Sequence, residues 1–494
     1  MDFGQSLLNF KDLKQRVEYA ATLPEKIVLE LCAKNTELNN TVCLNEDYWK
    51  IRYLKQSKSP PTIGPRSWKE IHLFSDINEV WSFGQNIYGQ LGLGDNVTRN
   101  TPTQIPGIKA KQIDCGNYHS MIMDINDNVL SFGNNHNGNL GLGDNVTRNK
   151  PTQIQNIEAK QIACNDFYSM IIDTDNNVWS FGNNMYGQLG LGNIGYGVNR
   201  NKPTQIHNIK AKQIACGVKH SLIMDINDDV WSCGNNDRGQ LGLGLFPHER
   251  RNKPTQIPDI KAKQISCGEY HSMIIDTNDN VWSFGSNTQG ELGLGDYMRR
   301  NKPTQITDIK AKHIDCGEYH SMIIDTNDNV WSFGYNIRGE LGLGYNKRRN
   351  IPTQIPNIKA KQIACGYYHS MIIDTDDNVW SFGANYLGQL GLGDNGEGTH
   401  RNKPTQIKNI KAIQISCGYD HSMILTNIQQ LLSFDEITNL FSQGEVTNFE
   451  IEHNLQIPYK AIQGIYVGTF IDKQGQKKYG YIRYNSQTNQ ILKP

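Results

Sequence analysis

Cysteine and histidine recur along the chain at nearly constant spacing, and both residue types can bind metals or act as nucleophiles. They share the phrase Cys-Gly-x-x-His-Ser. Its cysteines are Cys115, Cys164, Cys216, Cys267, Cys316, Cys365 and Cys417. Its histidines are His119, His220, His271, His320, His369 and His421, with Tyr168 in the remaining repeat. Such a set could form a ring of metal or anion ligands, or a disulfide scaffold.

The surrounding sequence favours structural roles for both residue types. The chain has no Cys-x-x-Cys pair, and equivalent positions in separate repeats should not meet in bridging geometry. We therefore expect buried free thiols in a reducing compartment. Tyr168 and the wide separation of the histidines argue against a metal ring, so we expect each histidine to bond the backbone of a neighbouring turn. The Asp-rich turns, such as Asp374 to Asn378, lack the glycine and distal glutamate of a calcium loop.

No catalytic motif is present. The chain contains no Gly-rich phosphate loop, nucleophile elbow or His-Glu-x-x-His sequence. Its glycine runs precede edge strands instead of opening helices, which excludes a dinucleotide site. We expect a non-enzymatic protein with no cofactor, no metal and no catalytic residue.

Arginine recurs at one further position. Each loop that follows Gly-Leu-Gly ends in Arg-Asn, at Arg99, Arg148, Arg200, Arg251, Arg300, Arg349 and Arg401. Alternating strand directions place these loops on the same face as the Cys-Gly-x-x-His turns. The sequence predicts a rim of arginines that could bind an acidic partner or phosphates. The alternative is that each arginine braces its own loop.

The elements that position these residues form a repeat of about 50 residues. Each repeat reads as four short strands: Lys-Gln-Ile-Ala-Cys, Ser-Met-Ile-Ile-Asp, Val-Trp-Ser-Phe and Pro-Thr-Gln-Ile. Proline in the fourth strand fits only an edge. A period of this length with four strands indicates a propeller or a solenoid, and seven units close more naturally into a ring.

The repeat resembles that of the regulator of chromosome condensation family. The family unit reads roughly small-Gly-x-x-His-Ser, a strand, a turn, then aromatic-x-Gly-x-Asn-x-x-Gly-Gln-Leu-Gly-Leu-Gly. The stretch from Cys267 reads CGEYHSMIIDTNDNVWSFGSNTQGELGLGD. The resemblance covers residues 66–434 and implies an all-β, seven-bladed propeller of four-stranded antiparallel blades. A strand from residues 66–79 or from Leu431 onward should complete the terminal blade.

The flanks differ from the repeats. Residues 1–58 read as a small helical segment, residues 59–65 as a linker, and residues 435–494 as a β-rich tail with a hairpin. The segment from Leu23 resembles a shortened F-box through Leu23, Pro24, Leu31 and Trp49. That resemblance implies contacts with a ubiquitin-ligase adaptor. The alternative is a helical hairpin packed beside the ring.

Composition limits the remaining choices. The formal net charge is +0, so no global field attracts nucleic acid or membrane. No apolar run approaches the ~20 residues of a membrane span, and the N-terminus does not read as a signal peptide. We therefore expect a protein of the cytoplasm or nucleus. The abundance of Asn, Ile and Lys suits an A/T-rich genome, such as that of a large DNA virus.

Three functions compete. We favour a protein-interaction scaffold, with substrate recognition for a ubiquitin ligase as its specific form. The family resemblance implies guanine-nucleotide exchange on a small GTPase as an alternative, which the lack of a substantial blade insertion disfavours. Chromatin or nucleic-acid binding through the arginine rim is the third function, and the missing basic N-terminal tail disfavours it.

Overall fold

The computed structural model describes residues 78–195, 197–244 and 248–427, together with short strands between residues 431 and 491. The chain divides into two compact units, Asn78–Asn427 and a second one made of residues 1–77 and 428–494. The expected helical segment, the linker and the F-box-like residues Leu23, Pro24, Leu31 and Trp49 lie outside the described residues.

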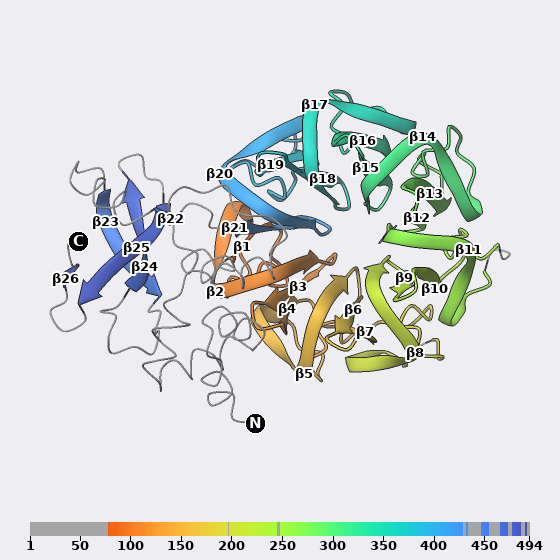
Figure 1. Cartoon of the computed structure of the whole chain (residues 1–494), viewed down its shortest axis with the longest axis horizontal. Helices are drawn as coiled ribbons and strands as arrows, with labels where there is room; N and C mark the ends of the chain where they lie inside the picture. Colours follow the sequence, from red (N-terminus) through yellow and green to blue (C-terminus); the bar gives the residue numbers. More distant parts are fainter. Residues whose placement is uncertain are drawn as a thin grey trace, which may run out of the picture. The chain divides into compact units, whose positions relative to one another are not determined.

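The first unit is a ring of 21 strands in repeating sets of three (Figure 1). Each set begins with a 17-residue strand: β2 (Arg99–Cys115), β5 (Arg148–Cys164), β8 (Arg200–Cys216), β11 (Arg251–Cys267), β14 (Arg300–Cys316), β17 (Arg349–Cys365) and β20 (Arg401–Cys417). The second strands are β3 (His119–Asp124), β6 (Tyr168–Asp173), β9 (His220–Asp225), β12 (His271–Asp276), β15 (His320–Asp325), β18 (His369–Asp374) and β21 (His421–Asn427). The third strands are β1 (Asn78–Gly84), β4 (Asn128–Gly133), β7 (Asn177–Gly182), β10 (Asp229–Gly234), β13 (Asn280–Gly285), β16 (Asn329–Gly334) and β19 (Asn378–Gly383).

Each long strand belongs to two blades. In β5, the segment from Arg148 to Gln153 pairs with β4, and the segment from Ala159 to Cys164 pairs with β6. The predicted fourth strand of one blade and first strand of the next are therefore one continuous strand. It bends at Asn156, whose φ is 61°, because asparagine tolerates this left-handed conformation without a chain break. Four antiparallel strands per blade, and seven blades in all, confirm the predicted fold class.

The ring is closed by a strand from its N-terminal side. β1 pairs in register with β21, from Asn78 opposite Asn427 to Gly84 opposite His421, and the two strands lie side by side in Figure 1. β1 also pairs with the first half of β2. The last blade therefore contains strands from both ends of the propeller.

The core lies between neighbouring blades. Phe333, for example, is fully buried and packs with Met273, Ile275 and Ile323. A β-carbon on Gly293, whose φ is +70°, would lie 2.9 Å from the Phe333 ring. Glycine at this position of the Gly-Leu-Gly loop is therefore needed both for backbone conformation and for close packing on the aromatic ring.

The two faces of the propeller carry different loops. One face, called the loop face here, has the Cys-Gly-x-x-His turns and the Gly-Leu-Gly loops. Their proximity is shown by Gln389 Nε2, which donates to Asp420 Oδ1 over 2.6 Å. The other, called the turn face, has the Asp-rich turns and the bends of the long strands, joined by ion pairs such as Lys111–Asp127 at 2.7 Å.

On the turn face, an aspartate and a tryptophan brace most blades. Trp331 Nε1 donates to Asp325 Oδ2 over 3.0 Å, and Asp325 also accepts bonds from Asn327 and Asn329. In the closing blade Thr426 takes the place of the aspartate, and Trp81 Nε1 is buried without a partner.

The second unit contains a five-stranded sheet. Its strands are β22 (Leu431–Leu432), β23 (Val446–His453), β24 (Ile465–Asp472), β25 (Lys477–Asn485) and β26 (Gln490–Ile491). β24 and β25 pair antiparallel from Ile471 opposite Lys477, which confirms the predicted C-terminal hairpin.

Candidate functional site

The seven arginines each begin a long strand at the end of a Gly-Leu-Gly loop. Arg99 donates to Val97 O and forms an ion pair with Asp95 at 2.6 Å. The same aspartate pair recurs at Arg148, Arg300 and Arg401. Arg200, Arg251 and Arg349 bond other groups of their own loops, namely Val198 O, Glu249 and the Tyr345 hydroxyl. This is the bracing geometry that the sequence left as an alternative. Partner binding by these arginines stays a prediction.

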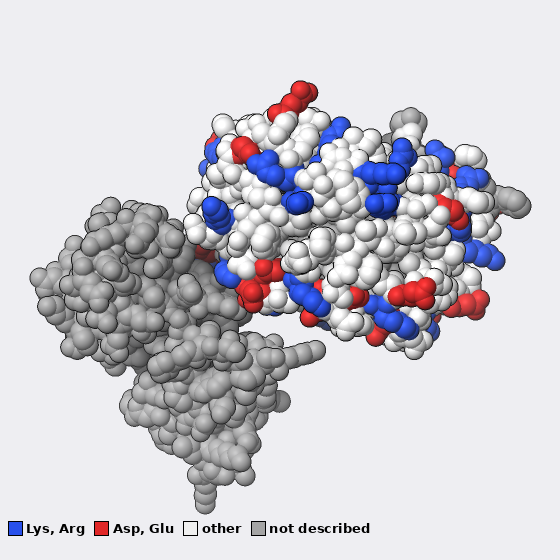
Figure 2. Space-filling view, turned by 90° about the horizontal axis from the view of Figure 1, so that it is seen from above, with Lys and Arg blue, Asp and Glu red and all other residues white. Residues whose placement is uncertain are grey.

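Charged side chains of both signs are mixed on the propeller. Figure 2 shows lysine and arginine beside aspartate and glutamate over the side that faces the viewer. Because the signs alternate, this surface offers no broad field for a phosphate backbone.

The repeated histidines link neighbouring blades. His119 Nε2 lies 2.8 Å from Ser169 Oγ of the next blade. The same contact joins His220 to Ser272, His271 to Ser321, His320 to Ser370, His369 to Ser422 and, across the closure, His421 to Ser120. Tyr168 completes this His–Ser belt by donating to His220 O and contacting Ser221 Oγ. The predicted partner, the backbone of a neighbouring turn, is wrong: the histidine reaches a serine hydroxyl.

The serines fix the protonation state of the histidines. Ser321 Oγ donates to Glu291 O over 2.9 Å, so it accepts a hydrogen bond from His271 Nε2–H. The Nδ1 atom of His271 is buried and has no partner. Burial, with the neighbouring histidines, lowers the pKa of His271 to about 3. The ring is therefore neutral and structural, and it is unsuited to proton transfer at neutral pH.

The repeated cysteines are buried free thiols, as the sequence predicts. Cys216 Sγ donates to Ala163 O of the preceding blade over 3.6 Å. Burial raises the pKa of Cys216 and of its equivalents well above the ordinary range for thiols. They are poor nucleophiles, because the thiolate is the reactive form.

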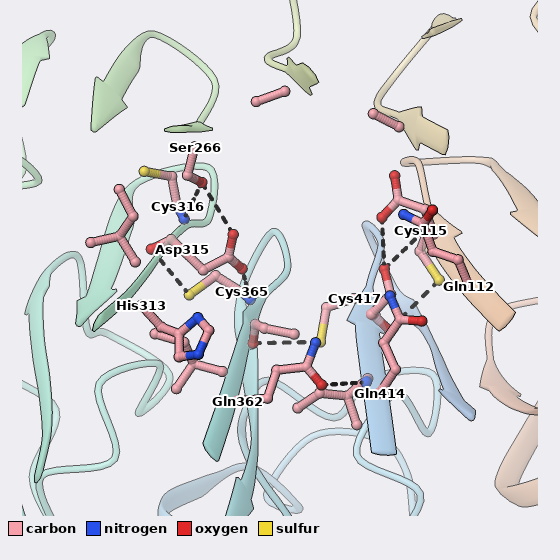
Figure 3. A pocket seen from close by; sticks show the side chains of 18 of the residues that line it. Gln112, Cys115, Ser266, His313, Asp315, Cys316, Gln362, Cys365, Gln414 and Cys417 are labelled. Carbon is pink, nitrogen blue, oxygen red and sulfur yellow. Dashed lines mark hydrogen bonds between the residues drawn. The ribbon is translucent and has the colours of Figure 1, made fainter. Parts of the chain in front are cut away.

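The inner strands surround a central channel of about 570 Å³ (Figure 3). Glutamines form a second belt around it: Gln264 Nε2 donates to Ile314 O, and Gln264 Oε1 accepts from Ile314 N. His313 takes the place of a glutamine in one blade, and Figure 3 shows it beside Gln362 in the wall.

Two aspartates in the channel wall accept hydrogen bonds from neighbouring blades with both carboxylate oxygens. Asp315 accepts from Cys365 N over 2.7 Å and from Ser266 Oγ over 3.1 Å. Asp114 accepts equivalent bonds from Cys164 N and Ser416 Oγ. Burial raises the pKa of Asp315 to about 7 and that of Asp114 to about 6. Both carboxyls bind adjacent blades together.

The mouth of the channel on the loop face is lined by residues that differ from repeat to repeat. The second residue after each repeated cysteine varies: Asn117, Asp166, Val218, Glu269, Glu318, Tyr367 and Tyr419. Tyrosines crowd one side, with ring centroids 4.0 Å apart for Tyr367 and Tyr419, and 5.5 Å apart for Tyr419 and Tyr118. Tyr319 lies 6.0 Å from Tyr367. We call Tyr118, Tyr319, Tyr367 and Tyr419 the tyrosine arc.

Carboxyl groups line the other side of the mouth. Asp166 Oδ1, Glu269 Oε2 and Glu318 Oε2 are buried and have no hydrogen-bond partner. Burial and the nearby Glu269 raise the pKa of Glu318 to about 10. Burial, together with the charge of Glu269, raises the pKa of Asp166 to about 7. Perturbed titration and unpartnered polar atoms in a cavity mark a candidate binding site.

Sequence reasoning missed this mouth because it concentrated on residues that all repeats share. Those residues build the belts. The signal was present in the positions that differ between repeats, where an aligned set shows acids in three repeats and tyrosines in two at the second residue after the cysteine.

Within the part of the chain that the structure describes, no group of three His, Cys, Asp or Glu side chains is arranged to hold a metal ion. In the same described part, no helix is long and apolar enough to cross a membrane.

The ring, its belts and its variable loop face define a seven-bladed propeller whose repeated residues serve closure. The model of the regulator of chromosome condensation (RCC1) repeat matches residues 78–123, 126–172, 175–224, 227–275, 278–324, 327–373 and 376–425. The chain belongs to the RCC1 repeat family.

Curated relatives match only in part. Over 81 residues the chain is 37% identical to the probable E3 ubiquitin-protein ligase HERC6 of Homo sapiens, covering 16% of this chain and 8% of that protein. Over 89 residues it is 33% identical to the RCC2 homolog of Xenopus laevis, covering 17% of each. The matches therefore span a small part of either relative.

Solved structures share the fold. Human WBSCR16 matches with a TM-score of 0.64 and 21% identity, over 71% of this chain and 99% of that one. Yeast RCC1 (Prp20), solved with Kap60, matches with a TM-score of 0.65 and 22% identity, over 78% of this chain and 98% of that one.

Proposed function

We propose that this protein is a non-enzymatic, intracellular scaffold that binds a protein partner on the loop face of its propeller. The observation that carries this proposal is that residues shared by the repeats have structural roles, whereas loop-face residues vary. Histidine, serine, glutamine and cysteine positions shared by the repeats hold neighbouring blades together. The second residue after each repeated cysteine and the loops after Gly-Leu-Gly, both on the loop face, differ between repeats in size, charge or length. Variable side chains on a rigid frame are the usual location of partner specificity.

Exposed apolar side chains support the choice of face. Ile87 and Ile337 on the loop face have exposed fractions of 53% and 55%. Tyrosine and arginine lie among them, with the Arg338 guanidinium 4.2 Å from the Tyr368 ring centroid. Tyrosine and arginine are enriched among the residues that dominate protein–protein binding energies.

A matched pair of variants tests the face. Ile87→Thr/Ile337→Thr changes the loop face, and Ile125→Thr/Ile226→Thr changes the turn face, where other repeats already carry threonine. Proteins captured from a eukaryotic lysate should be lost with the loop-face pair and kept with the turn-face pair. Loss with the turn-face pair alone would place the partner on the other face and contradict the proposal.

The specific form we propose is substrate recognition for a ubiquitin ligase, through the F-box-like residues Leu23, Pro24, Leu31 and Trp49. It rests on the sequence resemblance. HERC6 is named a probable E3 ubiquitin-protein ligase, but its match covers only 16% of this chain. A truncated protein without residues 1–58 should lose a ligase adaptor and cullin while keeping substrates of the propeller. Capture of those substrates without any adaptor by the full chain would leave a scaffold of another kind.

Guanine-nucleotide exchange is the main alternative outcome of the same capture. The yeast protein Prp20p has been studied for its binding to Gsp1p and histones, and it shares the fold of this chain. Recovery of a small GTPase, preferentially without nucleotide, would replace the scaffold proposal. Recovery of histones in a salt-sensitive manner would favour chromatin binding instead.

A further inference from the structure

The carboxyl groups at the channel mouth differ from the two aspartates of the channel wall. Asp114 and Asp315 accept bonds from a backbone N–H and a serine hydroxyl. Glu269 and Glu318, on adjacent blades, each keep a buried oxygen without a partner. A buried polar atom without a hydrogen-bond partner destabilises the folded chain. The ring does not need these acids, since Val218 and Asn117 hold the same position in other blades.

The two glutamates line a cavity of about 50 Å³ that Tyr367 also borders. That volume holds only a few water-sized groups, which suits the head of one side chain and not a folded segment. The cavity shares Cys316, Cys365 and other lining residues with the larger channel, so a bound side chain could extend inward.

The tyrosine arc supplies an aromatic wall beside these acids. On the same face, aromatic rings already hold cations of the chain: Lys219 Nζ, whose charge also acts on Glu269 and Asp166, lies 5.1 Å from the Tyr270 centroid, and Arg250 lies 4.8 Å from Tyr186. Among the described cation–ring contacts, none involves the arc. Aromatic rings next to carboxyl groups are the chemistry that recognises an ammonium or guanidinium group.

We propose that the channel mouth binds the side chain of a lysine or arginine presented by a partner protein. Glu269 and Glu318 accept its hydrogen bonds, Asp166 adds negative charge, and the tyrosine arc packs against its stem and head. The proposal rests on the scaffold function and specifies the chemistry of the partner. A protein segment is the occupant because the exposed side chains of Ile87 and Ile337 on the same face extend the contact beyond a single cation.

Binding should release protons. Glu318 carries a proton at neutral pH because burial and Glu269 raise its pKa to about 10, and a bound cation favours the ionised form. The proton passes to the buffer. The groups that interact with Glu318 and share in this equilibrium are Glu269, Asp166, Tyr319, Tyr367, Tyr368 and Tyr419. Lys219 acts on Glu269 and Asp166.

The experiment is fluorescence anisotropy on the full chain with a fluorescein-labelled (Gly-Ser-Arg)₄ peptide, and with (Gly-Ser-Gln)₄ as the neutral peptide, at constant salt. The test variant is Asp166→Asn/Glu269→Gln/Glu318→Gln. The matched control is Asp259→Asn/Asp308→Asn/Asp376→Asn, which removes three exposed turn-face carboxylates at positions where other repeats carry asparagine. Each variant replaces three carboxyl groups with amides.

We expect the arginine peptide to bind at least about tenfold more tightly than the glutamine peptide, and the mouth variant to lose that preference. The control should change affinity by less than about twofold. Affinity for wild type should rise between pH 6 and pH 8, and this rise should vanish in the mouth variant. Equal losses in both variants would show nonspecific attraction and overturn the proposal, as would equal binding of the two peptides.

A second variant separates this proposal from the scaffold function. Tyr367→Leu/Tyr419→Leu removes part of the arc without changing charge, and it should weaken the arginine peptide as well. If lysate partners are lost with Ile87→Thr/Ile337→Thr while the mouth variants bind the arginine peptide as wild type does, the scaffold function stands and the cation site fails. If the peptide depends on the mouth and no partner depends on the loop face, the scaffold function fails.

Discussion

The six histidines of the His–Ser belt are neutral donors, and their neutrality couples stability to pH. His271 has a pKa of about 3 in the folded chain, against an ordinary value near 6.5. The unfolded chain therefore binds a proton between these values that the folded chain does not. The contribution of His271 is fully present above pH 6.5 and is lost as pH falls toward 3. Acids of the channel wall such as Asp315, whose pKa desolvation raises to about 7, act with the opposite sign.

Replacing His271 with tyrosine isolates the pH-dependent contribution of this histidine to stability, because the wild type and the variant contain the same acids. Tyr168 already fills the equivalent position in one blade. We expect the unfolding free energy of His271→Tyr, relative to wild type, to improve by about 1.4 kcal/mol per pH unit below 6.5. Urea unfolding of both proteins at several values between pH 7 and pH 4.5 measures the difference. A constant difference across that range would mean that His271 is protonated in the folded state.

At this scale the repeat predicted which residues are structural but not what they contact. The period places each histidine beside a turn, whereas its partner is a serine about 50 residues away along the chain. Contacts between blades are equivalent in every repeat, so nothing in the repeat indicates whether a side chain bonds within its blade or across to the next. The acids at the mouth were missed for the opposite reason, since Glu269 and Glu318 stand where other repeats have Val218 or Tyr367.

Among the elements, the contact between a Gly-Leu-Gly loop and a neighbouring phenylalanine joins one blade to the next. Phe333 is fully buried against strands of two blades. Phe333→Ala should lower the unfolding free energy by about 3–5 kcal/mol, because the ring leaves a cavity that the rigid sheets cannot fill. Ile351→Ala, at a side chain with 53% exposure on the following long strand, should change it by less than about 0.5 kcal/mol. Similar losses for the two variants in urea unfolding would contradict this account.

The turns offer a test with its own control. Trp331 Nε1 donates to Asp325, whereas Trp81 Nε1 has no partner because Thr426 replaces the aspartate. Replacement by phenylalanine removes similar volume at both sites, but only Trp331→Phe leaves a carboxylate oxygen short of a donor. We expect Trp331→Phe to cost about 1–2 kcal/mol more than Trp81→Phe. Thermal unfolding of the two variants measures this difference. Equal unfolding temperatures would mean that the hydrogen bond between Trp331 and Asp325 contributes no net stability.

Strand content was predictable from the sequence, and strand continuity was not. Alternating apolar residues and flanking turn residues located four extended segments per repeat. The bend between the fourth and the next first strand is a single left-handed residue, such as Asn156. Asparagine and glycine at that position read equally well as a loop, so only the pairing of both halves of β5 shows that the strand continues between blades.

For the whole molecule, the repeat count predicted a ring, and the choice of closing strand required the structure. The sequence predicted closure by a strand from residues 66–79 or from Leu431 onward. The closing strand is β1, Asn78–Gly84, which overlaps the first of these ranges only at residues 78–79. β1 closes the ring because it pairs in register with β21 along its whole length. The chain then continues through the loop to Arg99 into β2, and β2 pairs with the other side of β1. Closure in this way gives both β1 and β21 a paired strand on each side.

Closure by a strand from the other end of the propeller makes β1 the weakest attachment in the ring. Val80 and Val281 are fully buried and occupy the same position in β1 and β13. Proline at either site removes a ladder hydrogen bond. β13 stays tethered to β12 by a tight turn, whereas β1 meets β21 only by closing a very long loop. Val80→Pro should therefore open the ring, and Val281→Pro should only loosen one blade.

Hydrogen exchange read by mass spectrometry distinguishes these two states. In Val80→Pro we expect β1 and β21 to lose protection together, with a larger radius of gyration by X-ray scattering. In Val281→Pro the loss should stay within β12, β13 and the first half of β14, and the radius should be unchanged. Protection of β21 that survives Val80→Pro would mean that the ring is held by the belts between blades, and that pairing of β1 with β21 is secondary.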